Sequence, residues 1–280
     1  MSNDNPFIII FSDLDGTLLD HDTYQWEDAG PAIARCKALQ VPVVLVSSKT
    51  RAEMDVLRHE MGLSDPFISE NGGGIFFPQE GIKKPPPGTI LASHCWQWNL
   101  GQPYESLVGS LRDIRKELGW ELRGFSDMDV REICELTGLD HQTALRASRR
   151  DFDEPFFLDQ KEGKNLEVLH TAATRRGLQI TEGGRFFHLH GRNDKGDAVD
   201  RITNWYKGSY PSLYSVALGD SPNDWSMLMR VDLPILIRSS RDFPEIRKEI
   251  PNLIVSRQKG PKGWNMEVLD ILEMRHEGAS

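Results

Sequence analysis

The sequence has few cysteines and no long apolar run. Its three cysteines, Cys36, Cys95 and Cys134, are odd in number and widely spaced, which fits neither a disulfide framework nor a cysteine metal site. A reducing setting is the simplest explanation, so we expect a cytoplasmic protein. The apolar stretch near the N-terminus follows no basic segment and is far shorter than a signal-peptide core or a membrane span. We therefore expect no membrane segment.

Positive charge is also scarce. The 33 lysines and arginines are outnumbered by 42 aspartates and glutamates, which gives a net charge of −9 and a pI near 5.4. There is no dense basic block and no internal repeat, and the one low-complexity tract covers residues 83–88. We therefore expect neither nucleic acid nor an anionic membrane as a general partner, and nothing indicates an obligate protein partner.

A length of 280 residues favours two domains. Segments 1–86 and 191–280 alternate strand and helix signals, as a parallel sheet with covering helices requires, whereas segment 87–190 resembles an inserted α+β domain. In the outer segments we predict strands at residues 7–11, 41–46, 67–69, 75–77, 213–218, 233–237 and 253–255, and helices at 28–39, 50–62, 195–206 and 264–274. In the insertion we predict helices at 104–118, 127–137 and 140–150, with Ser126 and Asp140 supporting the helix starts, and strands at 120–125, 155–158 and 185–190.

Two carboxylates directly follow the first predicted strand. Asp13 and Asp15, in the stretch Asp13-Leu14-Asp15-Gly16-Thr17, lie at the carboxyl end of that strand, where open α/β sheets place their chemistry. Such a pair fits a nucleophile with an acid/base partner around a hard cation such as Mg²⁺. An ordinary turn is the plain alternative. An EF-hand calcium loop is excluded, because it needs Gly at its sixth position and a preceding helix, whereas Gly16 is fourth and follows a strand.

Three further polar groups follow at strand ends or helix starts. Ser47 comes after the second predicted strand and suits a phosphate oxygen at a helix entrance. Lys195 opens a predicted helix and suits pairing with a phosphate and a carboxylate. Asp220 and Asp224 flank Asn223 after an apolar strand and suit the oxygen shell of Mg²⁺. Singly, each also fits a turn residue, a surface lysine or a helix cap, but their common order favours one site for phosphoryl transfer through an aspartyl-phosphate.

In this order the four pieces resemble motifs one to four of the haloacid dehalogenase (HAD) superfamily of phosphohydrolases. The long insertion between Ser47 and Lys195 resembles the branch with a type IIB cap, and within that branch the chain is similar to mannosyl-3-phosphoglycerate phosphatases. The supporting stretches are residues 46–50, 70–74, 135–139, 152–156, 183–189, 193–196 and 260–265. The resemblance implies an α/β fold: a Rossmann-like three-layer core with a mainly parallel sheet, built from residues 1–86 and 191–280, and an inserted α+β cap domain at 87–190.

The resemblance also implies an activity. It predicts Mg²⁺-dependent hydrolysis of the phosphate monoester of a small phosphorylated glycoside, mannosyl-3-phosphoglycerate or its glucosyl analogue, with Mg²⁺ as cofactor. Asp13 is the implied nucleophile and Asp15 the implied acid and base, while Ser47 and Lys195 neutralise charge on the transferred phosphoryl group. The implied metal ligands are Asp13, Asp15, Asp220 and Asp224.

Substrate recognition is expected from both the core and the cap. The expected substrate-binding residues are Ser48, Lys49, Asn71, Gly72, Arg150, Glu154, Arg185, His188 and Asn223. Arg150 and Arg185 are candidates for a carboxylate, because guanidinium binds it bidentately, but Arg150 also fits a cation at a helix end. His188 is a candidate for sugar hydroxyls that equally fits the surface of a strand. Lys49 stands where related phosphatases usually carry Arg, and it lacks the guanidinium fork.

Two other functions remain open from the sequence. A phosphatase of free sugar phosphates, or a related phosphotransferase, would share every core residue. A non-catalytic HAD-like binding protein fits less well, because both aspartates of the first motif are present. The aromatic residues Trp96, Trp98, Trp120 and Phe125 suggest a sugar-stacking platform, but we predict that they are core.

Overall fold

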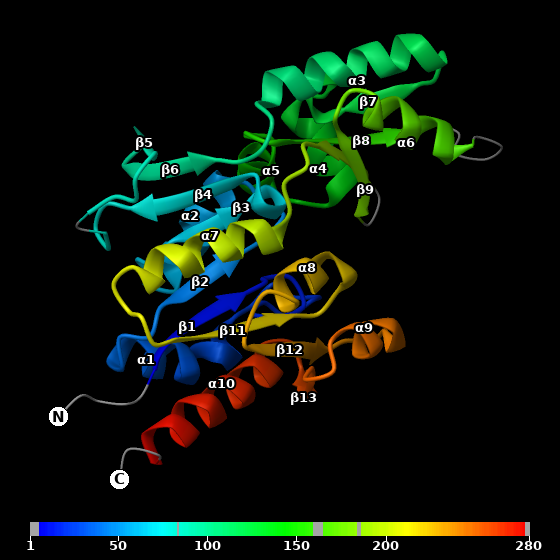
Figure 1. The fold of residues 1–280 in the computed structure, drawn as a ribbon. Coiled ribbons are helices and arrows are strands. Elements are labelled where there is room, and N and C mark those ends of the chain that lie inside the picture. Colours follow the sequence, from blue (N-terminus) through cyan, green and yellow to red (C-terminus); the bar gives the residue numbers. More distant parts are fainter. Residues whose placement is uncertain (1–5, 83, 159–164, 184–185, 278–280) are drawn as a thin grey trace.

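The computed structural model describes residues 6–82, 84–158, 165–183 and 186–277. It has a core with a nine-stranded sheet and a smaller unit with a four-stranded antiparallel sheet (Figure 1). The small sheet is inserted between a strand and a helix of the core, as the sequence predicted. The class is α/β with a Rossmann-like core, which confirms the expected fold. Among the described residues, no helix combines the length and the apolar character needed to cross a bilayer.

The large sheet places strand β1 near its middle. Its order is β13-β12-β11-β1-β2-β3-β4-β6-β5, with parallel pairing from β13 to β3 and antiparallel pairing from β3 to β5. Because β1 pairs in parallel with β11 and β2, the carboxyl ends of these three strands meet at one edge. The strands are β1 (Phe7–Ser12), β2 (Val43–Val46), β3 (Phe67–Ser69), β4 (Gly74–Pro78), β5 (Ile90–Ala92), β6 (Cys95–Asn99), β11 (Leu213–Gly219), β12 (Leu233–Arg238) and β13 (Ile254–Lys259).

Helices cover both faces of this sheet (Figure 1). On one face, α1 (Gly30–Ala38), α2 (Arg51–Glu60) and α10 (Gly260–Glu277) pack on the strands through Ile33, Met54 and Trp264. On the other face, α7 (Lys195–Lys207), α8 (Trp225–Leu228) and α9 (Pro244–Glu249) pack through Ile202, Leu228 and Ile246. The central strands are apolar on both sides and become fully buried, as expected for a parallel sheet between two helical layers.

The cap has its own core. Its sheet has the order β7-β8-β10-β9, and α3 and α6 cover the face that carries Leu189. Helices α4 and α5 contribute a smaller cluster on the opposite side, where Phe186 packs. The elements are α3 (Tyr104–Leu118), β7 (Leu122–Gly124), α4 (Val130–Thr137), α5 (His141–Ala147), β8 (Asp153–Leu158), α6 (Leu166–Thr174), β9 (Gln179–Gly183) and β10 (Phe186–His190).

The expected start of the cap at residue 87 is wrong. Strands β5 and β6 lie after that position, yet they extend the large core sheet by pairing with β4 and with each other. Trp96 and Trp98 of β6 pack against the same apolar cluster as Phe77, so burial of the aromatic rings ties this hairpin to the core. Trp120 and Phe125 also pack in apolar clusters. Phe125 is buried, as predicted, whereas Trp96, Trp98 and Trp120 are only partly buried at the margins of these clusters.

Several element boundaries also differ from the expected ones. Helix α4 begins at Val130 and is capped by Asp129, not near Ser126, whose N–H donates instead to Glu154. The capping box at Thr50 and the N-cap at Asp140 are confirmed. Helix α5 ends at Ala147 instead of residue 150, and the sequence did not indicate α6, β9 or α9. Short elements such as these are fixed by tertiary packing more than by local preference.

Candidate active site

Asp13 lies where β1 ends, at the edge shared with β2 and β11. Its backbone N–H donates to the carbonyl of Leu218 on β11 at 2.9 Å, which fixes the turn of the chain after the strand. Ser12 also anchors this end, because its hydroxyl accepts a hydrogen bond at 2.9 Å from the buried indole of Trp264 on α10. The sheet thus presents the Asp13 carboxylate at the edge where Ser47 and Asp220 also follow their strands.

Lys195 joins two of the predicted carboxylates. Its Nζ lies 2.7 Å from Oδ1 of Asp13 and 2.7 Å from Oδ1 of Asp224, and its side chain is only 1% exposed. It is the first residue of α7, which Asp194 caps through the N–H of Asp197. Burial would lower the pKa of Lys195, but Asp13 and Asp224 outweigh burial and raise it. Lys195 therefore stays an ammonium ion.

Three carboxylates form a compact acidic cluster. Oxygen atoms of Asp13, Asp220 and Asp224 all lie within 4.8 Å of one another. Burial and then the charge of Asp224 raise the pKa of Asp13, and the same two causes raise the pKa of Asp220 to about 7. One ammonium ion cannot balance three carboxylates, of which Asp13 and Asp224 are buried and Asp220 is half-buried, so the cluster has the oxygen ligands and the excess negative charge that suit a hard divalent cation.

The oxygens of Asp224 are already engaged by the protein. Oδ2 accepts the N–H groups of Asp220 and Ser221 at 3.0 and 3.1 Å, while Oδ1 faces Lys195. Asp224 thus holds the loop that carries Asp220, which leaves Asp13 and Asp220 with oxygens free for a cation. Gly16, at φ +80°, lies against Asp220, and a Cβ there would stand 2.6 Å from Asp220 Oδ2. A side chain at Gly16 would displace this carboxylate.

Asp15 stands apart from the acidic cluster and pairs with Lys49. Lys49 Nζ lies 2.9 Å from Asp15 Oδ2 and 5.4 Å from the centre of the Tyr24 ring. Burial would lower the pKa of Lys49, but Asp15 and Glu53 raise it. The Asp15 side chain was expected among the metal ligands, yet it is not part of the compact cluster. The ion pair with Lys49 instead orients the Asp15 carboxylate.

Hydrogen bonds connect the loops that carry Ser47, Asn71 and Asn223, close to the start of α7. Ser47 Oγ accepts the N–H of Lys49 at 3.2 Å, and its carbonyl accepts the N–H of Asn71 at 3.0 Å. Asn223 donates to the Asn71 side chain at 2.9 Å, so the loops after β2, β3 and β11 meet. Gly72 is required here: its φ is +90°, and a Cβ would stand 2.1 Å from the carbonyl of Asp194. Ser48 and Lys49 continue the loop that begins with Ser47 after β2.

The cap residues divide between the two faces of the small sheet. Glu154 lies opposite Leu189, on the face covered by α3; it is fully buried and hydrogen bonds with Tyr104 and Ser126. It was expected to bind sugar hydroxyls, and this placement corrects that expectation. His188 lies on the other face, and its Nδ1 is 2.8 Å from Asp153 Oδ2.

Arg150 makes contacts with both the core and the cap. Its guanidinium donates to the carbonyl of Ser48 at 3.0 Å and lies 3.5 Å from Asp153, and its side chain is 8% exposed. Its Nε also donates to the carbonyl of Ala147. Arg150 therefore links the cap to the Ser47–Lys49 loop of the core, and its expected role in binding a substrate carboxylate stays a prediction. Arg185 lies outside the described residues.

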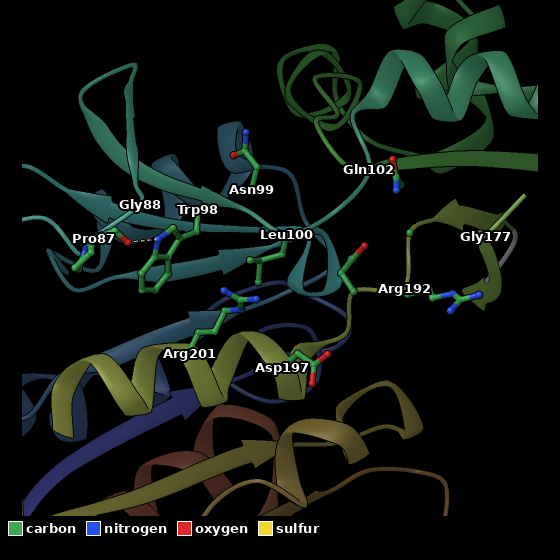
Figure 2. Close-up of a pocket in the computed structure, with 12 residues that line it drawn as sticks. Pro87, Gly88, Trp98, Asn99, Leu100, Gln102, Gly177, Arg192, Asp197 and Arg201 are labelled. Carbon is green, nitrogen blue, oxygen red and sulfur yellow. Dashed lines mark hydrogen bonds between the residues drawn. The ribbon is translucent and has the colours of Figure 1, made fainter. Parts of the chain in front are cut away.

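A cavity of about 870 Å³ lies beside the two chain segments that join core and cap (Figure 2). Asp197 and Arg201 extend toward it from α7 and Trp98 from β6, while Gln102 and Arg192 belong to the joining segments. Neither Asp13 nor any other carboxylate of the cluster lines it. This cavity is therefore not the candidate active site that the four sequence motifs form.

Sequence reasoning missed one contributor to the site. Glu70 is a buried acidic residue that reaches from the core to the cap, and it precedes Asn71 in the stretch 70–74 that supports the family resemblance. The only local signal was a carboxylate directly after the apolar strand at residues 67–69. Trp264, in the supporting stretch 260–265, is buried and holds the end of β1 below Asp13.

The comparisons with known proteins agree with this geometry. Residues 10–84 match the family described as haloacid dehalogenase-like hydrolase. The chain is 39% identical over 272 residues to a Methanococcoides burtonii protein named glucosyl-3-phosphoglycerate/mannosyl-3-phosphoglycerate phosphatase, covering 94% of this chain and 97% of that protein. A Persephonella marina protein of the same name is 39% identical over 285 residues, covering 97% and 99%.

A solved structure shares the fold. A haloacid dehalogenase-like hydrolase from B. subtilis superposes with a TM-score of 0.65 at 17% identity, covering 95% of this chain and 98% of that one. The near-complete coverage includes both core segments and the cap. With the site geometry and the full-length relatives, these comparisons establish that the chain belongs to the haloacid dehalogenase-like hydrolase family that includes the glucosyl-3-phosphoglycerate/mannosyl-3-phosphoglycerate phosphatases.

Proposed function

We propose that the protein is a Mg²⁺-dependent phosphatase that hydrolyses the phosphate monoester of mannosyl-3-phosphoglycerate or glucosyl-3-phosphoglycerate, releasing the glycosylglycerate and phosphate. The observation that carries this proposal is the compact group of Asp13, Lys195, Asp220 and Asp224 at the carboxyl edge of the sheet. The substrate class is supported by two relatives of that name, each 39% identical over almost the whole chain.

The acidic cluster fits Mg²⁺. All of its side-chain ligands are oxygens, and Asp13 and Asp220 retain free positions while their raised pKa values show that the negative charge is poorly compensated. Bound there, Mg²⁺ would neutralise negative charge on the phosphate group. Asp224 would hold the loop of Asp220 through backbone hydrogen bonds and would not itself be a direct ligand.

The proposed reaction consists of two successive displacements at phosphorus, both carried out by residues of the core. A carboxylate oxygen of Asp13 attacks phosphorus as the ester P–O bond breaks, and Asp15 gives a proton to the departing alkoxide. Water then attacks the phosphorus of the aspartyl-phosphate, Asp15 takes a proton from it, and the P–O bond to Asp13 breaks to release phosphate. Lys195 orients Asp13 from 2.7 Å, and Ser47 and Asn223 would bind the oxygens of the phosphoryl group.

Cap residues set the substrate preference in this proposal. His188 remains a candidate for the sugar hydroxyls, because Asp153 engages its Nδ1 and leaves Nε2 available. Lys49, Asn71 and Gly72 would border the phosphate from the core. The proposed setting is the cytoplasm, since the three cysteines are all free thiols, of which Cys36 and Cys95 are buried.

A substrate panel tests the assignment. We expect kcat/KM for mannosyl-3-phosphoglycerate or its glucosyl analogue to exceed that for mannose 6-phosphate and glucose 6-phosphate by at least about 100-fold, since a site built around polar groups rejects ligands that leave them unpaired. Phosphate release with and without EDTA measures the metal requirement. Equal rates on all four esters would favour the second candidate, a phosphatase of free sugar phosphates. Absence of turnover on every ester would favour a binding protein.

The effect of Mg²⁺ on thermal stability should depend on pH. The folded-state pKa of Asp220 is about 7, above the ordinary 3.8, so the metal-free native state holds this proton more tightly than the unfolded state does. Its contribution to stability therefore falls as pH rises from about 4 to 7 and is level above that. Because Mg²⁺ binds the ionised carboxylate, we expect the Mg²⁺-induced rise in Tm to be small at about pH 5 and largest at about pH 8.

Differential scanning fluorimetry with and without Mg²⁺ measures this shift. Saturating metal at about 100 times Kd adds about 2.7 kcal/mol of stability. Asp220→Asn should abolish most of the shift at both pH values, whereas Asp200→Asn, on the outer surface of α7, should leave it intact. A shift of equal size at both pH values would contradict the placement of the cation beside Asp220.

A further inference from the structure

Glu70 is a buried carboxylate that the proposed reaction does not use. It is 0% exposed and belongs to the core, in the short helical turn η2 (Glu70–Gly72) after β3. Its carboxylate nevertheless bonds to the cap. The N–H of Asp151 lies 3.0 and 3.2 Å from its two oxygens, and the N–H of Phe152 donates to Oε2 at 2.8 Å. These donors belong to the chain between α5 and β8.

The same turn carries part of the active site. Glu70 and Asn71 both have positive φ, 48° and 54°, a left-handed conformation that is costly for two consecutive residues with side chains. The N–H of Glu70 donates to the carbonyl of Lys49 at 3.1 Å, and that of Asn71 to the carbonyl of Ser47 at 3.0 Å. Asn71 also accepts the hydrogen bond from the Asn223 side chain. The strained turn therefore positions the loop after β2, which carries Ser47, and the loop after β11, which carries Asn223.

Neighbouring contacts fasten the same segment of the cap. Arg150 donates to the carbonyl of Ser48, and the Thr50 hydroxyl donates to the carbonyl of Arg146 at 2.9 Å. Gly73 of the core and Phe152 of the cap are tightly packed, because a Cβ on Gly73 would stand 2.4 Å from the Cβ of Phe152. The segment from Arg146 to Phe152 is therefore a fixed point of the cap, and the left-handed turn is held from the cap side.

We propose that Glu70 is a positioning residue, whose carboxylate uses the Asp151 and Phe152 amides of the cap to hold the Glu70–Asn71 turn, and with it Ser47 and Asn223, in the arrangement that binds phosphate. This role rests on the proposed phosphatase function, and it adds a coupling between cap and core. A strained turn persists only where its surroundings determine it, and here the determining contacts come from the cap. Burial raises the pKa of Glu70 to about 8, against the influence of Arg150.

The test compares Glu70→Gln with a matched control. A glutamine offers one carbonyl oxygen, and its NH₂ group faces an N–H donor instead of accepting from it. Asp65→Asn is the control: Asp65 is a half-buried acidic residue that also has a raised pKa, of about 6, and accepts the N–H of Val43 at 3.1 Å, but at the opposite end of β2. Glu70→Asp, which keeps the carboxyl group and retracts it, should give smaller changes in the same direction and supplies the result if E70Q does not fold.

Three quantities are measured in the full-length proteins: kcat on p-nitrophenyl phosphate, the inhibition constant of inorganic phosphate, and amide hydrogen exchange at Asp151 and Phe152. In E70Q we expect kcat to fall about tenfold or more, the phosphate inhibition constant to rise about tenfold, and exchange at these two amides to accelerate about tenfold or more, because an amide side chain leaves at least one of the two cap N–H groups without its acceptor. Asp65→Asn should match the wild type in all three.

Each outcome decides between the roles. Faster exchange in E70Q with unchanged kcat and phosphate inhibition would make Glu70 a structural tie only and would overturn the proposal, as would no change at all. If the wild-type protein and Asp65→Asn hydrolyse no ester, the proposed function fails. Direct titration with inorganic phosphate then replaces the inhibition constant, so weaker phosphate binding in E70Q would still support the positioning role.

Discussion

Asp13→Asn is expected to lose at least about 10³-fold in kcat on any phosphate monoester, because the substitution removes the attacking carboxylate oxygen. Asp220 and Asp224 are close by, but Asp224 is held by Lys195 and backbone N–H groups, and Asp220 follows a different strand. Neither can take the position of Asp13 above the end of β1. The loss should therefore appear in kcat for all substrates alike.

The measurement is steady-state phosphate release at saturating Mg²⁺, together with acid-quench trapping of the phosphorylated protein. The wild type should form an acid-stable, hydroxylamine-sensitive acyl phosphate, and Asp13→Asn should form none. Asp200→Asn serves as the control for loss of an aspartate elsewhere, because Asp200 makes only a surface ion pair with Arg230. More than about one per cent of wild-type turnover in Asp13→Asn would contradict the nucleophile assignment.

Lys195→Met should have the second largest effect, on both activity and stability. The ammonium group lies within hydrogen-bond distance of both Asp13 and Asp224, and its loss leaves these buried carboxylates in repulsion. Removing one partner of a buried ion pair costs about 3–5 kcal/mol. We also expect kcat to fall by about 10²- to 10³-fold, since charge on the transferred group and the orientation of the nucleophile both depend on Lys195.

Chemical denaturation and initial rates measure the two effects separately. Mg²⁺ should restore part of the lost stability of Lys195→Met, because a cation beside Asp13 and Asp220 offsets the same repulsion, but it should not restore kcat. Lys207→Met, at the other end of α7, is the matched control. If Lys195→Met were as stable as that control without metal, the buried charge cluster would not have the energetic role inferred here.

More of the candidate site could be predicted from the sequence in the core than in the cap. In the core, Asp13, Ser47 and Asp220 follow apolar strands, and parallel pairing of β2, β1 and β11 brings the ends of these strands together whatever the details of the loops. In the cap, no sequence pattern indicated which face of the sheet a residue would occupy. Glu154 and His188 both looked available for a sugar, and only the register of β8 with β10 separates them.

Charge pairing was the other part that sequence reasoning could not reach. Lys49 was interpreted as a substrate cation, but it pairs with Asp15, and Arg150 was interpreted in the same way, but it holds Ser48 and Asp153. Both cations lie far in the sequence from at least one partner. The Lys49 pair depends on how the loops after β1 and β2 lie together, and the Arg150 contacts depend on how the inserted cap packs on the core, and no local pattern encodes either.

The sequence by itself determined the α/β class, the insertion of a second unit and the four groups of residues that build the site, because apolar strands ending in polar residues align their carboxyl ends in a parallel sheet. Tertiary structure alone decided that β5 and β6 belong to the core, that Lys195 bonds two carboxylates at once, and that Glu70 reaches the cap. The physical reason is distance along the chain: alternation and capping act over a few residues, whereas these contacts join segments that only packing brings together.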